Sequence, residues 1–326
     1  MRGLVVVLAG LLGANAMAQD SSTSVSAGSS ESRSSLKVID VLRDKKFEED
    51  KHITDMELKA QGGSLNRYSL KFDLGYSGSP VNELYEPNRP NPDNRPGDNR
   101  TYLSGTMGLR YRTTSDTALN FGAGYKWFTP YQAITGEEVK RPSYAHNYDI
   151  SDPQVSFDNT YKAGDTQMRS SARVSKTTSD YYVSRGQFTD IGFTQAAKYN
   201  VGTTRWILGG QLAADFYGYT RSYVRYSSKA NPGDGNVSKY YLNFIPSVEY
   251  KLVDNLNFNT SLGYPYQNLR ADKSWWRWNH PLSTWRVGLG WGIKRDVYFN
   301  PYVNFFAEKP AFNTASLNFS AVFSIF

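Results

Sequence analysis

Apolar and polar residues alternate with a period of two in twelve segments between residue 66 and the end of the chain. In residues 68–77, for example, aromatic and aliphatic side chains occupy one face, and Lys71 and Asp73 share the other face with serine and glycine. This period is that of a β-strand with two different faces. About ten residues is also the length that a tilted strand needs to cross a membrane. The same alternation is clear in residues 103–112, 119–127 and 284–294.

The connections between these segments alternate between long polar stretches and tight turns. A soluble β-sandwich offers no reason to place every long loop at one end, whereas bacterial outer-membrane barrels have short periplasmic turns and long external loops. We therefore predict an all-β fold, an antiparallel transmembrane β-barrel of about 12 strands over residues 66–326 with an N-terminal extension. The long connections are expected at 78–100, 129–152, 177–187, 221–238, 266–281 and 307–314, and the tight ones at 113–116, 163–165, 200–203, 253–255 and 295–296.

The first eighteen residues have the pattern of a secretory signal peptide. Arg2 supplies the basic region, and the apolar stretch at 4–12 is too short to span a bilayer. Residues 16–18 read Ala-Met-Ala and fit the A-x-A cleavage site, so residues 1–18 are expected to be removed on export. Residues 19–35 are rich in serine, which is typical of a flexible linker.

The second half of the 19–65 extension is charged. Leu36, Ile39, Leu42 and Phe47 lie near helical spacing, which favours a short helix. Such a segment could rest in the periplasm, fold into the barrel as a plug, or be a disordered tail. An extra strand at 53–60 is a further alternative, but it would give an odd strand number, and bacterial single-chain barrels have even numbers.

Composition agrees with a barrel and narrows the chemistry. The chain contains no cysteine, which excludes disulfides, thiol catalysis and thiolate metal sites. It holds 24 Tyr, 17 Phe and 7 Trp, although its mean hydropathy is only −0.56. A chain that is polar on average and rich in aromatics suits a barrel with one face toward lipid and the other toward water. Many of these aromatics fall at the expected strand ends, where interfacial girdles lie.

The chain ends with an alternating strand whose last residue is Phe326. Here the sequence resembles the Gram-negative outer-membrane β-barrel superfamily, whose members typically end in a strand with a terminal phenylalanine that the barrel assembly machinery reads. The resemblance implies an outer-membrane location, contact with outer-membrane lipid and lipopolysaccharide, and recognition of Phe326 by that machinery. One detail departs from the pattern, because the apolar residues from Leu317 to Ile325 take the opposite phase to Phe326. A bulge near the end would reconcile them.

The formal net charge is +7, and the strand phase predicts where the basic residues gather. The polar face carries too much charge to form a dry core, so we assign it to the lumen, with twelve basic and five acidic residues. A narrow channel lined by one sign of charge concentrates ions of the other sign. The alternative is a sealed core in which the cations pair with the inward acids. Solute contact is expected from Lys71, Arg110, Arg112, Lys126, Arg169, Arg173, Arg286 and Lys294; the other inward cations are Lys162, Lys198, Arg205 and Lys251, and the inward acids are Asp73, Asp158, Asp190, Asp215 and Glu249.

The strand count and two basic tracks, Arg110-x-Arg112 and Arg169-x-x-x-Arg173, are similar to those of small monomeric twelve-stranded porins for acidic oligosaccharides. This resemblance implies a porin-like channel for passive diffusion of small, preferentially anionic solutes. A closed barrel that presents external loops for structural or adhesive contacts is the alternative.

The fifth long connection contains Trp275, Trp276, Arg277 and Trp278. Three indoles beside a guanidinium could stack on sugars or dock a partner, and the alternative is an interfacial belt or loop packing. We therefore treat this stretch as a possible external ligand loop.

Catalytic chemistry is not expected. The three histidines, His52, His146 and His280, all fall outside the expected strands. An outer-membrane hydrolase that uses His146 or His280 is the third hypothesis. No cofactor and no metal site is predicted. Nucleic acid is not an expected partner, because the basic residues alternate with apolar ones along strands and export removes the chain from it.

Overall fold

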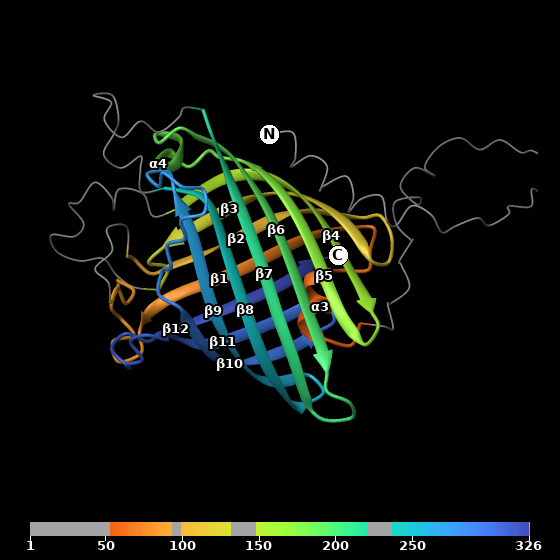
Figure 1. Ribbon diagram of the computed structural model, residues 1–326. Coiled ribbons are helices and arrows are strands. Elements are labelled where there is room, and N and C mark those ends of the chain that lie inside the picture. The colour runs from red at the N-terminus through yellow and green to blue at the C-terminus, as the bar shows by residue number, and fades with distance from the viewer. Residues whose placement is uncertain (1–52, 93–98, 132–147, 221–236, 326) are drawn as a thin grey trace, which may run out of the picture. The chain divides into compact units, whose positions relative to one another are not determined.

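The computed structural model describes residues 53–92, 99–131, 148–220 and 237–325, all within one compact unit. They form a closed barrel in which every strand pairs with its neighbour in sequence and β1 pairs with β12 (Figure 1). The predicted twelve-stranded antiparallel barrel is confirmed. The strands are β1 Tyr68–Pro80, β2 Tyr102–Arg112, β3 Thr117–Phe128, β4 Tyr148–Ala163, β5 Thr166–Lys176, β6 Gln187–Asn200, β7 Trp206–Tyr219, β8 Ser238–Val253, β9 Leu256–Leu269, β10 Thr284–Lys294, β11 Val297–Phe306 and β12 Ser316–Ile325.

The connections alternate as predicted. Those after β2, β4, β6, β8 and β10 have two to five residues, whereas the others are longer and gather at the opposite end of the barrel. One long connection carries the short helix α4, Asp180–Val183. Because the strand number is even, β1 begins and β12 ends at the tight-turn end. Neither helix of the described residues is long and apolar enough to cross a membrane.

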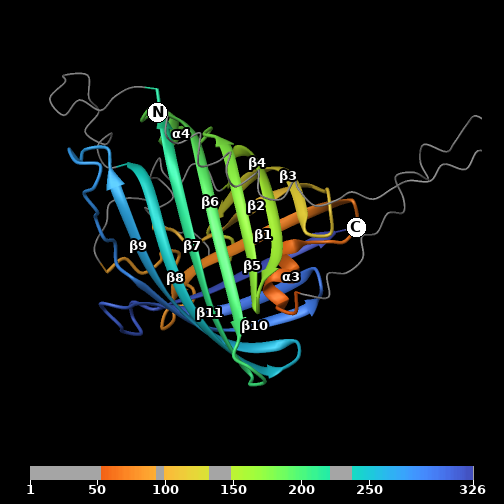
Figure 2. The same ribbon diagram turned by 45° about the vertical axis from the view of Figure 1, so that its right-hand side comes forward.

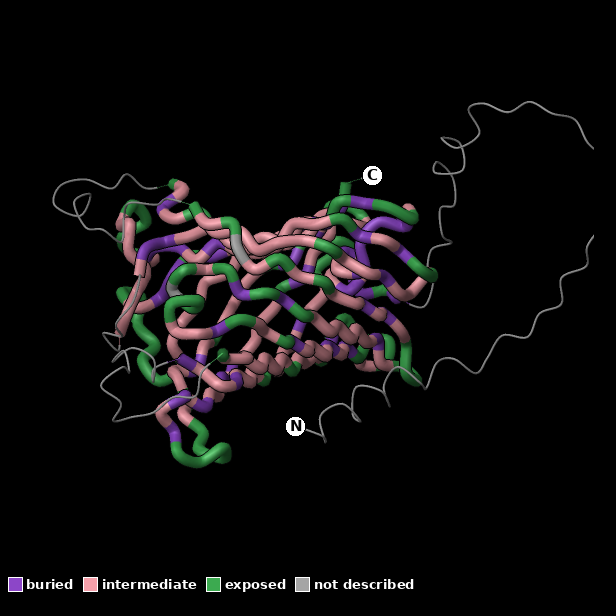
Figure 3. The backbone as a smooth tube through the Cα atoms, turned by 90° about the horizontal axis from the view of Figure 1, so that it is seen from above, coloured by how far each residue is buried: buried purple, intermediate pink, exposed green. Residues whose placement is uncertain are grey.

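The two faces of the strands differ in exposure, as Figure 3 shows along the backbone. Arg110 is 1% exposed, whereas the adjacent Leu109 is 45% exposed. In β1, Ser69 and Lys71 are buried and Leu70 is exposed. The polar face therefore points into the barrel and the apolar face outward. This is the inverse of a soluble barrel and the arrangement of one that crosses a membrane.

The pairing of β12 corrects one expectation. Its register with β1 runs without a break from Ile325 opposite Leu70 to Asn318 opposite Ser77. The only irregularity of this pair lies at the other end, between Ser77 and Pro80. Phe323 stacks on Phe72 with ring centroids 4.9 Å apart, which favours the unbroken register. The described part of β12 therefore has no bulge near its end, and Phe326 lies outside the described residues.

The helix α3, Met56–Gly62, precedes β1 and is drawn in orange in Figures 1 and 2. It contacts β4 and β5 on one side and β10, β11 and β12 on the other. These two groups of strands lie on opposite sides of the ring, so the helix lies inside the barrel. The alternative of a strand at 53–60 is therefore wrong, and the role of the extension as a plug stays a prediction. Residues 1–52, with the expected signal peptide and linker, lie outside the described residues.

Local sequence explains why the helix is short. The carboxylate of Asp55 caps its first turn by accepting the N–H of Leu58 at 2.9 Å. Gly63 ends it with a φ of 73°, a backbone conformation that glycine adopts without strain. A side chain there would also meet Arg110, because an added Cβ would lie 3.1 Å from its Cδ.

Candidate functional site

Residues 53–64, which we call the plug segment, are held by side chains of the barrel wall. Gln167 on β5 is buried, and its Oε1 accepts the N–H groups of Thr54 at 2.6 Å and Asp55 at 2.9 Å. Arg295, in the last tight turn, donates to the carbonyl of Gly63. These bonds satisfy backbone groups that would otherwise be buried without partners.

Arg112 on β2 binds the end of the plug segment. Its guanidinium donates to the carbonyls of Gly62 at 2.5 Å, Gly63 at 3.2 Å and Ser64 at 2.8 Å. It also donates to the carbonyl of Ser115 in the adjacent turn. A planar guanidinium with five N–H donors suits such a cluster of acceptors. Arg112 thus contacts the chain's own backbone in this structure, and its contact with solute stays a prediction.

A charged cluster joins the plug segment to the far wall. The ammonium of Lys198 on β6 lies 3.2 Å from Asp55, 2.7 Å from Glu57 and 2.5 Å from Glu249 on β8. Lys198, Asp55 and Glu249 are buried. Charges taken out of water need close partners, and removing one partner of a buried pair is strongly destabilising. Lys198 is therefore the main electrostatic link between the plug segment and the barrel.

The shape of the barrel wall also fits the plug segment. Gly292 on β10 lies against Met56, since an added Cβ would come within 2.5 Å of the Met56 sulfur. Ile53 and Leu58 pack with Ala196 of β6 in a small buried apolar cluster. The wall at the tight-turn end is thus shaped around the plug segment.

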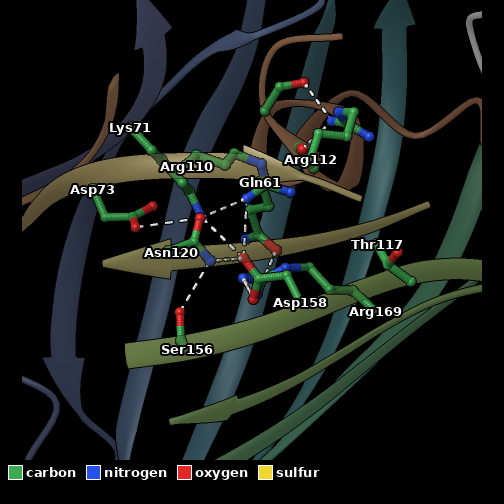
Figure 4. A network of polar contacts seen from close by, with 12 residues as sticks. Gln61, Lys71, Asp73, Arg110, Arg112, Thr117, Asn120, Ser156, Asp158 and Arg169 are labelled. Atoms are coloured by element: carbon green, nitrogen blue, oxygen red, sulfur yellow. Dashed lines mark hydrogen bonds and ion pairs between the residues drawn. The ribbon is translucent and has the colours of Figure 1, made fainter. Parts of the chain in front are cut away.

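A second network is centred on Asp158 of β4, which is 1% exposed (Figure 4). Its carboxylate lies 3.1 Å from Arg110 Nη1, 2.8 Å from Arg169 Nη2 and 3.7 Å from Lys71 Nζ. The amide of Asn120 also donates to it at 2.9 Å. Five strands, β1 to β5, thereby share one carboxylate. Three of the cations assigned to the lumen are drawn into this network, and their contact with solute stays a prediction.

Arg173, four residues after Arg169 on β5, lies further from the tight turns. Its Nη2 is 2.7 Å from Asp190 and 3.0 Å from Asp215. Arg173 remains about one-third exposed, because the lumen is open beside it. This arginine is therefore paired and still accessible from the interior.

Two polar cavities lie in the interior of the barrel among the residues that the structure describes. The larger measures about 400 Å³ and is lined by both the Asp158 network and Arg173. The smaller measures about 180 Å³ and lies between the plug segment and the opposite wall, where Arg286 contributes to its lining. Gln61 of the plug segment lines both cavities. The larger cavity has room for several water molecules, since one occupies ~30 Å³ in the liquid.

Cations at the long-loop end contact aromatic rings. Arg89 and Lys126 lie over the ring of Tyr102, at 4.6 and 4.2 Å from its centroid. Arg286 lies 5.4 Å from the centroid of Tyr302. Contact with a ring stabilises a cation without neutralising its formal charge. Arg100 and Arg270 make similar contacts, with Phe128 at 3.9 Å and Tyr219 at 4.1 Å.

The remaining predicted cation, Lys294, lies at the tight-turn end of β10 and is exposed. Sequence reasoning placed Lys198 and Glu249 in the lumen but missed their partners on the plug segment, Asp55 and Glu57. It also missed Gln167. One signal was present, because an aspartate immediately before the apolar Met56, with Glu57 next in the first turn, is typical of a helix start.

The possible external ligand loop is folded back on the outside of the barrel. The ring of Trp275 lies 5.2 Å from that of Tyr240, and the ring of Trp278 lies 5.5 Å from that of Tyr266. Trp276 and Arg277 are largely exposed, and Arg277 Nε lies 3.4 Å from the carboxylate of Asp272. A role in ligand binding is not decided by this placement and stays a prediction.

His280 follows that loop and makes structural contacts. Its Nε2 faces both Ser283 at 3.1 Å and Glu308 at 3.5 Å, whereas Nδ1 faces the carbonyl of Pro265. A Ser-His-acid triad needs the acid on the ring nitrogen opposite the serine, so this arrangement does not match one. His52 and His146 lie outside the described residues.

Glu308 links two external loops by accepting the N–H of Ser283 at 2.8 Å. Partial burial alone would raise the pKa of Glu308, but hydrogen bonds from the backbone and side chain of Ser283 hold it below its usual range. Within the described ranges, no group of three or more acidic or histidine side chains is placed to hold a metal ion.

No protein family model matches the chain, and no curated protein matches it in sequence. Solved structures similar to it include an outer membrane channel from Pseudomonas putida, with 9% identity, a TM-score of 0.47 and coverage of 81% of this chain and 98% of that chain. The NanC porin has 10% identity and a TM-score of 0.40 over 79% of this chain and 98% of that chain. The KdgM porin in complex with disordered oligogalacturonate has 9% identity and a TM-score of 0.38 over 79% and 99%. Similarity of this degree concerns the barrel fold alone.

Proposed function

We propose that this protein is an outer-membrane channel of a Gram-negative bacterium, through which small polar solutes diffuse passively with a preference for anions. The observation that supports this most directly is the polar cavity of about 400 Å³ inside a closed barrel with an apolar outer wall. A barrel of this kind gives water a path through hydrocarbon, and the width of its interior grows with strand number.

The preference for anions is supported by the distribution of charge along the lumen. Near the tight turns, cations such as Arg110 and Lys198 are bound to carboxylates. Near the long loops, Arg89, Lys126 and Arg286 contact aromatic rings. Arg286 also lines the smaller cavity, so its positive charge faces the interior and raises the local concentration of anions there.

Reversal potentials in planar bilayers under a salt gradient test this proposal. We expect anion selectivity in the unmodified protein, and a shift toward cations when Lys126 and Arg286 are both replaced by glutamine. Lys273→Gln is the matched control, because it removes one charge from an exposed site in an external loop. An unchanged reversal potential in the double variant, or an equal shift in the control, would contradict the assignment of selectivity to this mouth.

A closed barrel is the second candidate, and the plug segment favours it. Residues 53–64 and the ion pairs around them occupy the tight-turn end of the lumen. If the channel proposal is correct, releasing this segment must raise conductance. A barrel that stays non-conducting after release of the plug segment would instead support a structural or adhesive role.

A further inference from the structure

The larger cavity of the lumen has as many basic as acidic side chains in its lining. Its charged residues, among those that the structure describes, are Lys71, Arg169, Arg173, Asp73, Asp158 and Asp215. Three positive and three negative side chains give a formal net charge of zero. A cavity of this kind offers a simple anion little net attraction. What it can bind is therefore decided by how the charges are arranged along it.

The charges near Asp158 have a positive excess. Lys71, Arg110 and Arg169 are the cations paired with Asp158 (Figure 4), and Asp73 is a second carboxylate beside Lys71. Three cations and two carboxylates leave a formal charge of +1 at this end of the cavity, which we call the basic end. Lys71 Nζ lies 3.5 Å from Asp73 and 3.7 Å from Asp158, longer than the ~2.7–2.9 Å of a charge-assisted hydrogen bond. Its N–H groups can therefore donate to a solute in the cavity.

The charges near Arg173 have a negative excess. One cation, Arg173, faces two carboxylates, Asp190 at 2.7 Å and Asp215 at 3.0 Å, which leaves a formal charge of −1 at this acidic end. Gly192 leaves room for the contact, because an added Cβ would lie 2.7 Å from Asp215 Oδ1 and 3.1 Å from Arg173 Nη2. The side chain of Asp215 is 24% exposed, and a carboxylate has about four acceptor sites. Asp215 can therefore accept further hydrogen bonds from a solute.

The two ends are separated along β5. Arg169 and Arg173 are four residues apart on this strand, which corresponds to ~13 Å at ~3.3 Å per residue. Ser171 lies midway between them and lines the cavity. Further neutral amide and hydroxyl side chains in the lining, which can donate and accept hydrogen bonds, are those of Gln154, Ser156, Thr194 and Gln211. The volume of about 400 Å³ is within the range of ~300–1,000 Å³ that is usual for small-molecule sites.

We propose that this cavity binds a zwitterion of the length of a short peptide, with its carboxylate toward Lys71 and its ammonium toward Asp215. An extended chain of three residues spans ~10 Å, so its two termini reach within hydrogen-bond distance of ends that lie ~13 Å apart. Its peptide groups then face the neutral amides and hydroxyls between the two ends. A solute with a single charge would satisfy only one end. The inference rests on the proposed channel for the solute's passage, whereas binding itself does not require conduction.

Three peptides of one backbone length separate the two contacts. At about pH 7, triglycine carries both charges, N-acetyl-triglycine only the carboxylate, and triglycine amide only the ammonium. Binding is measured by isothermal titration calorimetry on the purified full chain in detergent micelles. We expect triglycine to bind about tenfold or more tightly than either capped peptide, because hydrogen bonds to charged groups are stronger than neutral ones.

Substitutions at the two ends should act on different peptides. Asp215→Asn should weaken the binding of triglycine about tenfold and leave that of N-acetyl-triglycine unchanged. Lys71→Gln should weaken the binding of triglycine and N-acetyl-triglycine and leave that of triglycine amide unchanged. The unaffected peptide in each case shows that the cavity is still folded. Asp165→Asn is the control, because Asp165 is an exposed carboxylate in the tight turn between β4 and β5.

Three results would overturn the proposal: equal affinity for the three peptides, a loss in Asp215→Asn that is the same for triglycine and N-acetyl-triglycine, or an equal loss in Asp165→Asn. Failure of this proposal is distinct from failure of the channel. A barrel that conducts but does not prefer triglycine refutes only the binding of zwitterions. A barrel that prefers triglycine but does not conduct refutes only the channel.

Discussion

Replacing Lys198 by methionine should release the plug segment from the barrel. Methionine keeps most of the length and volume of the side chain but removes the ammonium. Asp55, Glu57 and Glu249 would then face one another without the cation that lies within 3.2 Å of all three. Two of them belong to the plug segment, so their repulsion from Glu249 would act directly against docking.

The magnitude follows from burial. Lys198 and Glu249 are both buried, and removing one partner of a buried ion pair costs about 3–5 kcal/mol. At 1.4 kcal/mol for each factor of ten, the undocked fraction should rise roughly 100- to 4,000-fold. The barrel itself should persist, because its strands are joined by backbone hydrogen bonds around a closed ring.

The absence of native cysteine makes the change measurable. Ala60 on α3 is fully buried in the docked state, so a thiol placed there by Ala60→Cys reacts only when the segment undocks. Under conditions where docking is faster than labelling, the maleimide labelling rate is proportional to the undocked fraction. The rate should therefore rise by the same factor in the Lys198→Met background, together with single-channel conductance.

Lys162→Met is the control, because Lys162 is an exposed lysine at the tight-turn end of β4. Asp55→Ala provides a second route, since it removes a partner of Lys198 and the helix cap while leaving the wall complete. If Lys198→Met and Asp55→Ala both label at rates within about threefold of the parent, the reasoning is refuted. A threefold change in rate corresponds to a change of less than about 1 kcal/mol in the free energy of docking.

Two further predictions concern the Asp158 network and the external loops. Asp158→Asn leaves Lys71, Arg110 and Arg169 without their shared carboxylate and should lower the free energy of unfolding by about 3–5 kcal/mol, measured by urea denaturation in micelles. Asp73→Asn, at a partly exposed carboxylate, should lower the free energy of unfolding by less than about 1 kcal/mol. If both variants lower the free energy of unfolding equally, Asp158 is not the central partner of these cations. The pKa of Glu308 is depressed in the folded state. The ionised carboxylate therefore stabilises the contact between the two loops above the unfolded-state pKa of Glu308, and this stabilisation is lost as pH falls through the folded-state pKa. Amide exchange at Ser283, corrected for its intrinsic rate, should therefore lose protection in acid, and Glu308→Gln should abolish that pH dependence; a dependence that survives the substitution would contradict it.

The strands and their order could be predicted because each depends on local pattern. A period of two defines a face, and the faces of neighbouring strands must agree across a closed sheet. The alternation of Leu109 and Arg110 therefore predicts that Leu109 faces lipid and Arg110 faces the lumen. This prediction does not require the partner strand to be known. Loop lengths then order the strands, because short turns join only adjacent antiparallel strands.

The arrangement of charge within the lumen could not be predicted in the same way. Asp55, the N-cap of α3 and a partner of Lys198, precedes that lysine by 143 residues. Nothing in the strand pattern indicates that the extension folds inward. Asp158 collects cations from strands that are not all its neighbours, which depends on the radius of the barrel and the reach of each side chain.

The net charge of the lumen-facing residues is therefore a poor measure of selectivity between anions and cations. The same residue type has opposite consequences at the two ends of this lumen. Arg110 is bound to a carboxylate and stabilises the wall, whereas Arg286 lies against an aromatic ring and keeps its charge toward the interior. What an anion experiences is set by position along the axis and by the partner of each cation. Selectivity should consequently respond to substitutions near the long loops, and stability to substitutions near the tight turns.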